Sequence, residues 1–101
     1  MITLGTGTLI DDRGTSFEVH LGVTWEPDGR WSGVIGAGLD WDELAHRELM
    51  LAVPAELGPS GHPVVSDVVV DAVLDNEIRA HGSGSYQRGR PRRRRSRALT
   101  S

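Results

Sequence analysis

The chain has 101 residues and a net charge of −3, with 38% hydrophobic and 25% charged residues, so we expect one small globular domain. It contains no cysteine, which excludes disulfides, thiol catalysis and cysteine-ligated zinc. No apolar run approaches the roughly 18 residues that span a bilayer. The N-terminus also lacks the basic start and apolar stretch of a signal peptide. We therefore expect a cytoplasmic protein with no membrane partner.

The charge is divided unevenly along the chain. Residues 1–87 carry all 14 acidic residues and four of the eleven arginines, for a net charge of −10, whereas residues 88–101 carry seven arginines and no acid. A polybasic segment of this kind cannot bury enough apolar surface to offset the entropy lost on ordering. We therefore predict a compact β domain over residues 1–87 and a disordered arginine-rich tail over residues 88–101.

The first half of the domain reads as three strands. A short strand precedes a loop at Gly14, and a longer one covers residues 17–25, where apolar and polar side chains alternate strictly. Such alternation is typical of a half-buried antiparallel strand. Pro and Gly in the segment 26–29 predict a tight turn, and residues 30–35 complete a hairpin. Trp25 and Trp31 then lie beside each other, either as core packing, which we favour, or as a platform for a ligand.

A short helix is predicted between the halves, over residues 40–47. Asp40 can cap its first turn, Glu43 stands three residues later as in a capping box, and Leu44 points toward the core. Trp41 is open to two interpretations, a semi-exposed lid over one end of the domain or a satellite of the core.

The second half repeats the order of the first. Residues 49–53 form a strand that stops at Pro54, a loop covers residues 56–63, and a long strand covers residues 64–74. Its inward face is expected to carry Val64, Val68, Val70, Ala72 and Leu74. Asp75 and Asn76 form a turn, and a strand over residues 77–81 follows.

Both halves end in Gly-x-Gly, at residues 36–38 and 82–84. We therefore predict an all-β fold of two similar three-stranded halves, either a small six-stranded antiparallel barrel or a two-layer sandwich, with one short helix.

The order of these residues resembles a known family. The run from Gly7 to Ile10, then Gly14, then residues 17–21 and the segment 26–33 are similar to small actinobacterial β domains of unknown function. Those domains occur alone or fused behind flavin-dependent monooxygenases. The resemblance covers residues 5–84, and this chain departs from it in its longer loop at residues 56–63 and in its arginine tail. It implies a fold and an accessory role, and it supplies no catalytic residues.

Two surfaces are candidates for function. The tail carries the arginines that could bind phosphate groups of nucleic acid, which are Arg88, Arg90, Arg92, Arg93, Arg94, Arg95 and Arg97. The body is acidic, so nucleic acid is a partner through the tail only. The second surface is a ligand or partner face made of Trp41, Val65, Asp67, Val69, Asp71 and Val73. For the two aspartates, a solvated sheet face is favoured over a pair of carboxylates that act in acid/base chemistry.

No catalytic or metal-binding residue is predicted, and no cofactor is expected. The four histidines lack ligand spacing, although His20 and His81 could approach each other if their strands are neighbours. The leading hypothesis is a non-enzymatic binding or accessory module for a protein or small ligand, as a monomer or homodimer. The alternatives are a nucleic-acid-associated protein acting through its tail, and a small enzyme with a site at the barrel mouth near Trp41 and Asp42.

Overall fold

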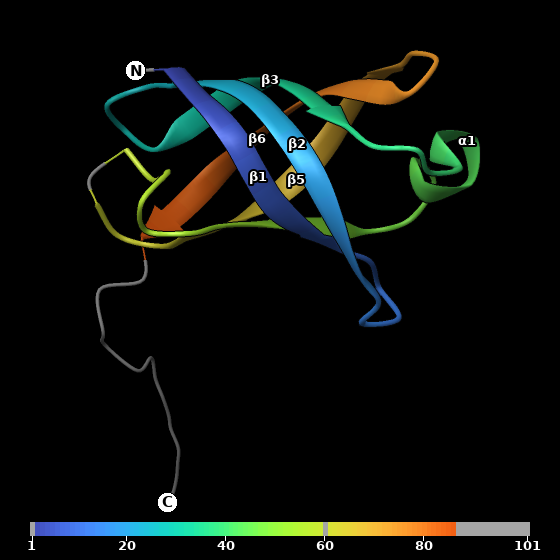
Figure 1. Ribbon diagram of the computed structural model, residues 1–101, viewed down its shortest axis with the longest axis horizontal. Coiled ribbons are helices and arrows are strands. Elements are labelled where there is room, and N and C mark those ends of the chain that lie inside the picture. Colours follow the sequence, from blue (N-terminus) through green and yellow to red (C-terminus); the bar gives the residue numbers. More distant parts are fainter. Residues whose placement is uncertain (1, 60, 87–101) are drawn as a thin grey trace, which may run out of the picture.

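The computed structural model describes residues 2–59 and 61–86, which form six strands and one short helix (Figure 1). The elements are β1 (Ile2–Ile10), β2 (Ser16–Trp25), β3 (Arg30–Gly36), α1 (Trp41–Leu44), β4 (Leu49–Val53), β5 (Val64–Val73) and β6 (Glu77–Tyr86). These agree with the elements that the sequence predicts, apart from details given below. The arginine-rich segment 88–101, predicted to be disordered, lies outside the described residues.

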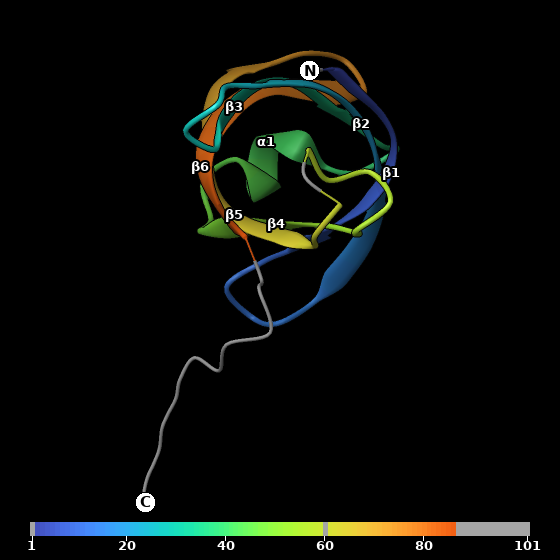
Figure 2. The same cartoon turned by 90° about the vertical axis from the view of Figure 1, so that its left-hand side faces the viewer.

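The strands form a closed antiparallel barrel. Their order is β1-β2-β3-β6-β5-β4, and β4 pairs back with β1, so the sheet closes into the ring seen in Figure 2. Each half of the chain supplies three consecutive strands, and the halves join where β3 pairs with β6 and β4 with β1. The barrel alternative is therefore confirmed over the two-layer sandwich.

The two open ends of the ring are covered by different segments. The helix α1 lies at one end, and the loop that follows β4 lies at the other (Figures 1 and 2). The side chain of Leu57 in this loop packs against the core, and its carbonyl oxygen accepts a hydrogen bond from the Thr3 hydroxyl at 2.9 Å. Together with fifteen buried apolar side chains among the described residues, these segments fill the interior of the barrel.

The helix begins as the sequence predicts. The Asp40 carboxylate accepts the backbone N–H of Glu43 at 3.4 Å, and Leu44 is buried. The lid interpretation of Trp41 is wrong, because its side chain is only 2% exposed and its indole N–H donates to the Ala37 carbonyl at 3.0 Å. An indole whose N–H finds a partner can bury its large apolar area without leaving a polar group unsatisfied, so Trp41 belongs to the core.

The indoles of Trp25 and Trp31 belong to the core. They stand opposite each other on β2 and β3, with ring centroids 6.5 Å apart and ring planes tilted by 56°. Each N–H donates to a buried hydroxyl, that of Trp25 to Thr3 at 2.8 Å and that of Trp31 to Ser66 at 2.7 Å. Core packing is confirmed, and the ligand-platform alternative is wrong because both side chains are at most 4% exposed.

A bulge interrupts β5. The pairing shifts between Val70 and Ala72, so that Val70 faces Ala80 while Ala72 faces Arg79. One extra residue reverses the sides on which the following side chains lie. The uninterrupted alternation expected over residues 64–74 is therefore wrong at its end. Leu74, expected to point inward, is 39% exposed.

The strand β6 is longer than predicted. It continues to Tyr86, so that the Gly-x-Gly of residues 82–84 lies within the strand and does not end it. Gly82 pairs with Trp31 of β3, and a Cβ at this position would stand 2.2 Å from the Asp67 carbonyl oxygen and 2.8 Å from the Trp31 indole nitrogen. Glycine is required at residue 82 because two neighbours approach its Cα closely.

The hydrogen bond between Trp31 and Ser66 gives a stability prediction. Ser66→Ala leaves the buried indole N–H without its acceptor, and it should lower the free energy of unfolding by about 1–3 kcal/mol in urea denaturation. Ser32→Ala is the matched control, because Ser32 is an exposed serine on β3, and it should change stability by less than about 0.5 kcal/mol. Equal effects of the two substitutions would contradict the assignment.

Candidate functional site

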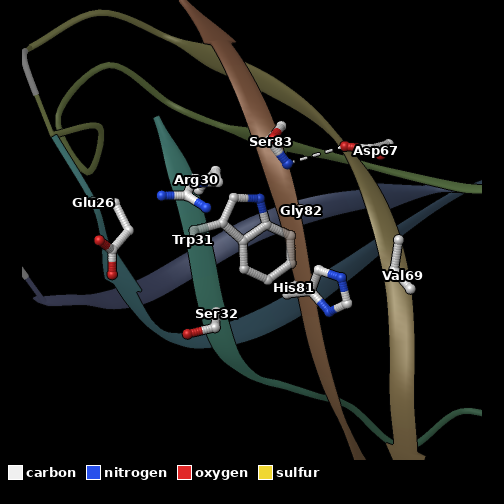
Figure 3. Close-up of a pocket in the computed structure, with 9 residues that line it drawn as sticks. All are labelled: Glu26, Arg30, Trp31, Ser32, Asp67, Val69, His81, Gly82 and Ser83. Atoms are coloured by element: carbon white, nitrogen blue, oxygen red, sulfur yellow. Dashed lines mark hydrogen bonds between the residues drawn. The ribbon is translucent and has the colours of Figure 1, made fainter. Parts of the chain in front are cut away.

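A groove of about 470 Å³ opens on the outer side of β3, β6 and β5 (Figure 3). It is lined by Glu26 and Arg30 at the β2–β3 turn, by Trp31 and Ser32 of β3, by His81, Gly82 and Ser83 of β6, and by Asp67 and Val69 of β5. The groove thus lies across the junction between the two halves of the chain. We refer to it as the β3-β6-β5 groove.

The bottom of the groove is set by the core. The indole of Trp31 packs against Gly82 and reaches Ser66 of β5. The pairs Ser66–Gly84 and Val69–His81 flank this point in the ladder between β5 and β6. Between them the Asp67 carboxylate, rather than a backbone carbonyl, accepts the N–H of Ser83 at 3.1 Å. This bond holds the Asp67 side chain over the outer surface of β6.

Arg30 is held by the turn that precedes it. Its guanidinium Nε donates to the Asp28 carboxylate at 2.7 Å, and its backbone N–H donates to the same side chain at 3.1 Å. The backbone hydrogen bond from Arg30 is the main cause that lowers the pKa of Asp28 from its ordinary value, and the nearby guanidinium charge adds to it. Both side chains are more than half exposed, so the pair positions Arg30 more than it stabilises the fold.

His81 is held in a similar way. Its ring Nδ1 lies 2.9 and 3.0 Å from the two carboxylate oxygens of Asp71, the extra residue of the β5 bulge. Ser32 stands opposite His81 across the β3–β6 pair. Figure 3 shows the Ser32 hydroxyl pointing away from the imidazole. The three residues therefore do not form the hydrogen-bonded relay that a serine nucleophile requires.

The predicted partner surface is divided among three places. Asp67 and Val69 line the β3-β6-β5 groove, and Asp71 reaches its edge through His81. Val65 belongs to a second groove, of about 500 Å³, between the β1–β2 and β4–β5 hairpins, where Phe17 and Pro63 also lie. Val73 lines a third hollow beside α1. Trp41 lines the same hollow as Val73, with a side chain that is only 2% exposed.

The residues on the other side of the groove were not predicted as site residues. Glu26, Arg30 and Ser32 belong to β3 or to the turn before it, and Ser83 to β6. They join Asp67 because β3 pairs with β6, two strands about 40 residues apart in the sequence. The outward alternation of Arg30, Ser32 and His81 is the sequence signal that could have placed them on one face.

The histidine pair considered in the sequence does not form. His20 of β2 and His81 of β6 are separated by β3, so the expectation that they approach each other is wrong. Within residues 2–59 and 61–86, no three His, Asp or Glu side chains gather in an arrangement that could hold a metal ion.

No family model, curated protein or solved structure matches the chain. The resemblance to actinobacterial β domains therefore stays a prediction. Over the described residues, no helix is long and apolar enough to cross a membrane.

The Asp28–Arg30 contact gives a second prediction. In Arg30→Met the backbone N–H donor remains while the guanidinium is lost, so the pKa of Asp28 should rise only part of the way to its ordinary value. A carboxylate with a lowered pKa stabilises the turn above its ordinary pKa, and this contribution is lost as the pH falls through its value in the folded protein. Carboxyl chemical shifts recorded over a pH series measure the change. The control Arg79→Met removes an arginine that does not contact Asp28, and it should leave the pKa of Asp28 unaltered. If the pKa of Asp28 returned fully to its ordinary value in Arg30→Met, the backbone hydrogen bond would not be the main cause of the shift.

Proposed function

We propose that this protein is a non-enzymatic binding module that holds a segment of a protein partner in the β3-β6-β5 groove. The observation that carries the proposal is the position of this groove on the outside of a barrel whose interior is filled by its own side chains. Binding sites inside barrels need an interior wide enough to hold a ligand. Here concave surface of mixed polar and apolar character lies on the sheet itself.

The form of the groove favours a protein segment over a small ligand. Pockets for small molecules are concave and enclose most of the ligand surface, whereas this groove is largely open to solvent. Val69, 45% exposed, supplies an apolar contact. Charged and hydroxyl groups line the rest of the groove, with Arg30 and His81 held in place by Asp28 and Asp71. A mixture of apolar and polar contacts is typical of protein interfaces.

The remaining hypotheses stay predictions. The accessory role implied by the family resemblance agrees with a binding module. Monomer and homodimer both stay open, as does a cytoplasmic location. The enzyme alternative receives less support, because Trp41 and Leu44 fill the barrel end at which its site was expected.

Site-specific crosslinking in the native host tests the proposal. A photoreactive phenylalanine analogue in place of Val69 should yield a discrete crosslinked species of higher mass. The matched control replaces Leu4, an exposed apolar residue on the outer side of β1 (75% exposed). It should not give that species. The partner, identified by mass spectrometry and purified, should bind the wild type about tenfold more tightly than Asp67→Arg. Crosslinks from the Leu4 position alone, or from neither position, would refute the proposal.

The nucleic-acid hypothesis rests on the arginine-rich segment and is tested separately. Fluorescence anisotropy of duplex DNA should give a steep loss of affinity with salt for the full chain. Replacing Arg92, Arg93, Arg94 and Arg95 by glutamine should make the slope of log affinity against log salt shallower by about 3 to 4, since each lost phosphate contact removes about 0.9. No binding at physiological salt would end this hypothesis.

A further inference from the structure

The β3-β6-β5 groove carries an excess of negative charge. Each of its two basic side chains already has a carboxylate partner, Asp28 for Arg30 and Asp71 for His81. Glu26 and Asp67 also line the groove, and no cationic partner is recorded for either among the described residues. Figure 3 shows these two carboxylates on opposite sides of the groove, and both residues are exposed. The groove therefore complements a cationic segment rather than an anionic one.

The last described strand ends next to this groove. Ser83 lines it, and β6 ends three residues later at Tyr86. The N–H of Gly84 donates to the Gly29 carbonyl at 2.9 Å, which fixes the end of β6 beside the turn that carries Glu26. From Ser83, the first arginine of the C-terminal segment, Arg88, is at most about 18 Å away along an extended chain. The following arginines can reach the groove after a reversal of a few residues.

We propose that the arginine-rich segment of this chain, residues 88–97, binds back into the β3-β6-β5 groove. Guanidinium groups pair with carboxylates in a planar, two-point geometry, and Glu26 and Asp67 supply such carboxylates on both sides. The body has a net charge of −10 and the segment after Gln87 a net charge of +7, so the attraction is mutual. Attachment to the same chain gives the segment a local concentration in the millimolar range, which favours even a weak contact.

This inference rests on the proposed function, because it names an occupant of the same groove. A tethered occupant competes with an external partner for the groove, and an external polyanion competes with the groove for the arginines. The contact therefore regulates both the binding of a partner to the groove and the binding of a polyanion to the arginines. Because the charges are exposed, salt weakens the contact.

The test compares amide spectra of two full-length ¹⁵N-labelled proteins, the wild type and a variant with Arg92→Gln, Arg93→Gln, Arg94→Gln and Arg95→Gln. At about 20 mM salt the two spectra should differ at the amides of the groove, above all at Ser32, Val69 and Ser83. At about 500 mM salt, where the screening length falls to a few ångströms, the differences should disappear.

Charge-neutral variants of the groove provide the control. Combining Glu26→Gln with Asp67→Asn should remove most of the low-salt differences, and the new amide oxygen at residue 67 still accepts the Ser83 N–H. The matched pair Glu18→Gln and Asp42→Asn removes the same charge from other exposed sites, and it should leave the differences in place.

Each outcome of the spectra is decisive. Absence of groove differences at low salt, or equal loss in both pairs, would overturn the inference. Crosslinking at residue 69 to an external protein would in that case still support the proposed function, so the two failures are distinguishable.

Discussion

The contact between the Trp31 indole and the Ser66 hydroxyl connects the core of the barrel to its outer surface. It bridges β3 and β5 beneath β6, because Gly82 leaves room for the indole where any Cβ would collide. At the same point of the β5–β6 ladder the Asp67 carboxylate takes the N–H of Ser83. One large buried side chain therefore packs against three strands close to the point where the Ser83 N–H holds an outward carboxylate. The Asp67 carboxylate is thus held on a strand, and side chains on strands are positioned more precisely than side chains on loops.

Polar atoms in the interior are satisfied by a small number of hydroxyls. Thr3 accepts from the Trp25 indole and donates to the Leu57 carbonyl, which connects the core to the loop that covers one end of the barrel. The Trp41 indole bonds to the Ala37 carbonyl at the other end. Each of the three indoles thus has a hydrogen-bond acceptor for its N–H, a hydroxyl for Trp25 and Trp31 and a backbone carbonyl for Trp41. A core of this kind leaves little space for a ligand inside the barrel.

Local patterns in the sequence predicted most of the fold. Strict alternation in residues 17–25 gave β2, Pro and Gly at residues 26–29 gave the turn, and Asp40 gave the cap of α1. The errors arise where two distant segments meet. Gly82 looked like the end of a strand. The groups that require glycine there, the Asp67 carbonyl and the Trp31 indole, lie on other strands and leave no local signal. The bulge at residue 71 has no local signature, since aspartate on an outward face fits a regular strand equally well.

Prediction of the candidate site from local sequence patterns fails for the same reason, because most of its residues come from segments that are distant in the sequence. Asp67 and Val69 could be identified from the outward face of one strand, whereas Glu26, Arg30 and Ser83 join them only through the β3–β6 pairing between the halves. This pairing also brings the end of β6 beside the β2–β3 turn. The sequence shows the charge asymmetry only as an acidic block followed by a basic one. The structure shows in addition that the acidic groove lies next to the end of β6. Ser83 of β6 lines the acidic groove, and β6 ends three residues later at Tyr86, just before the basic segment begins in the sequence.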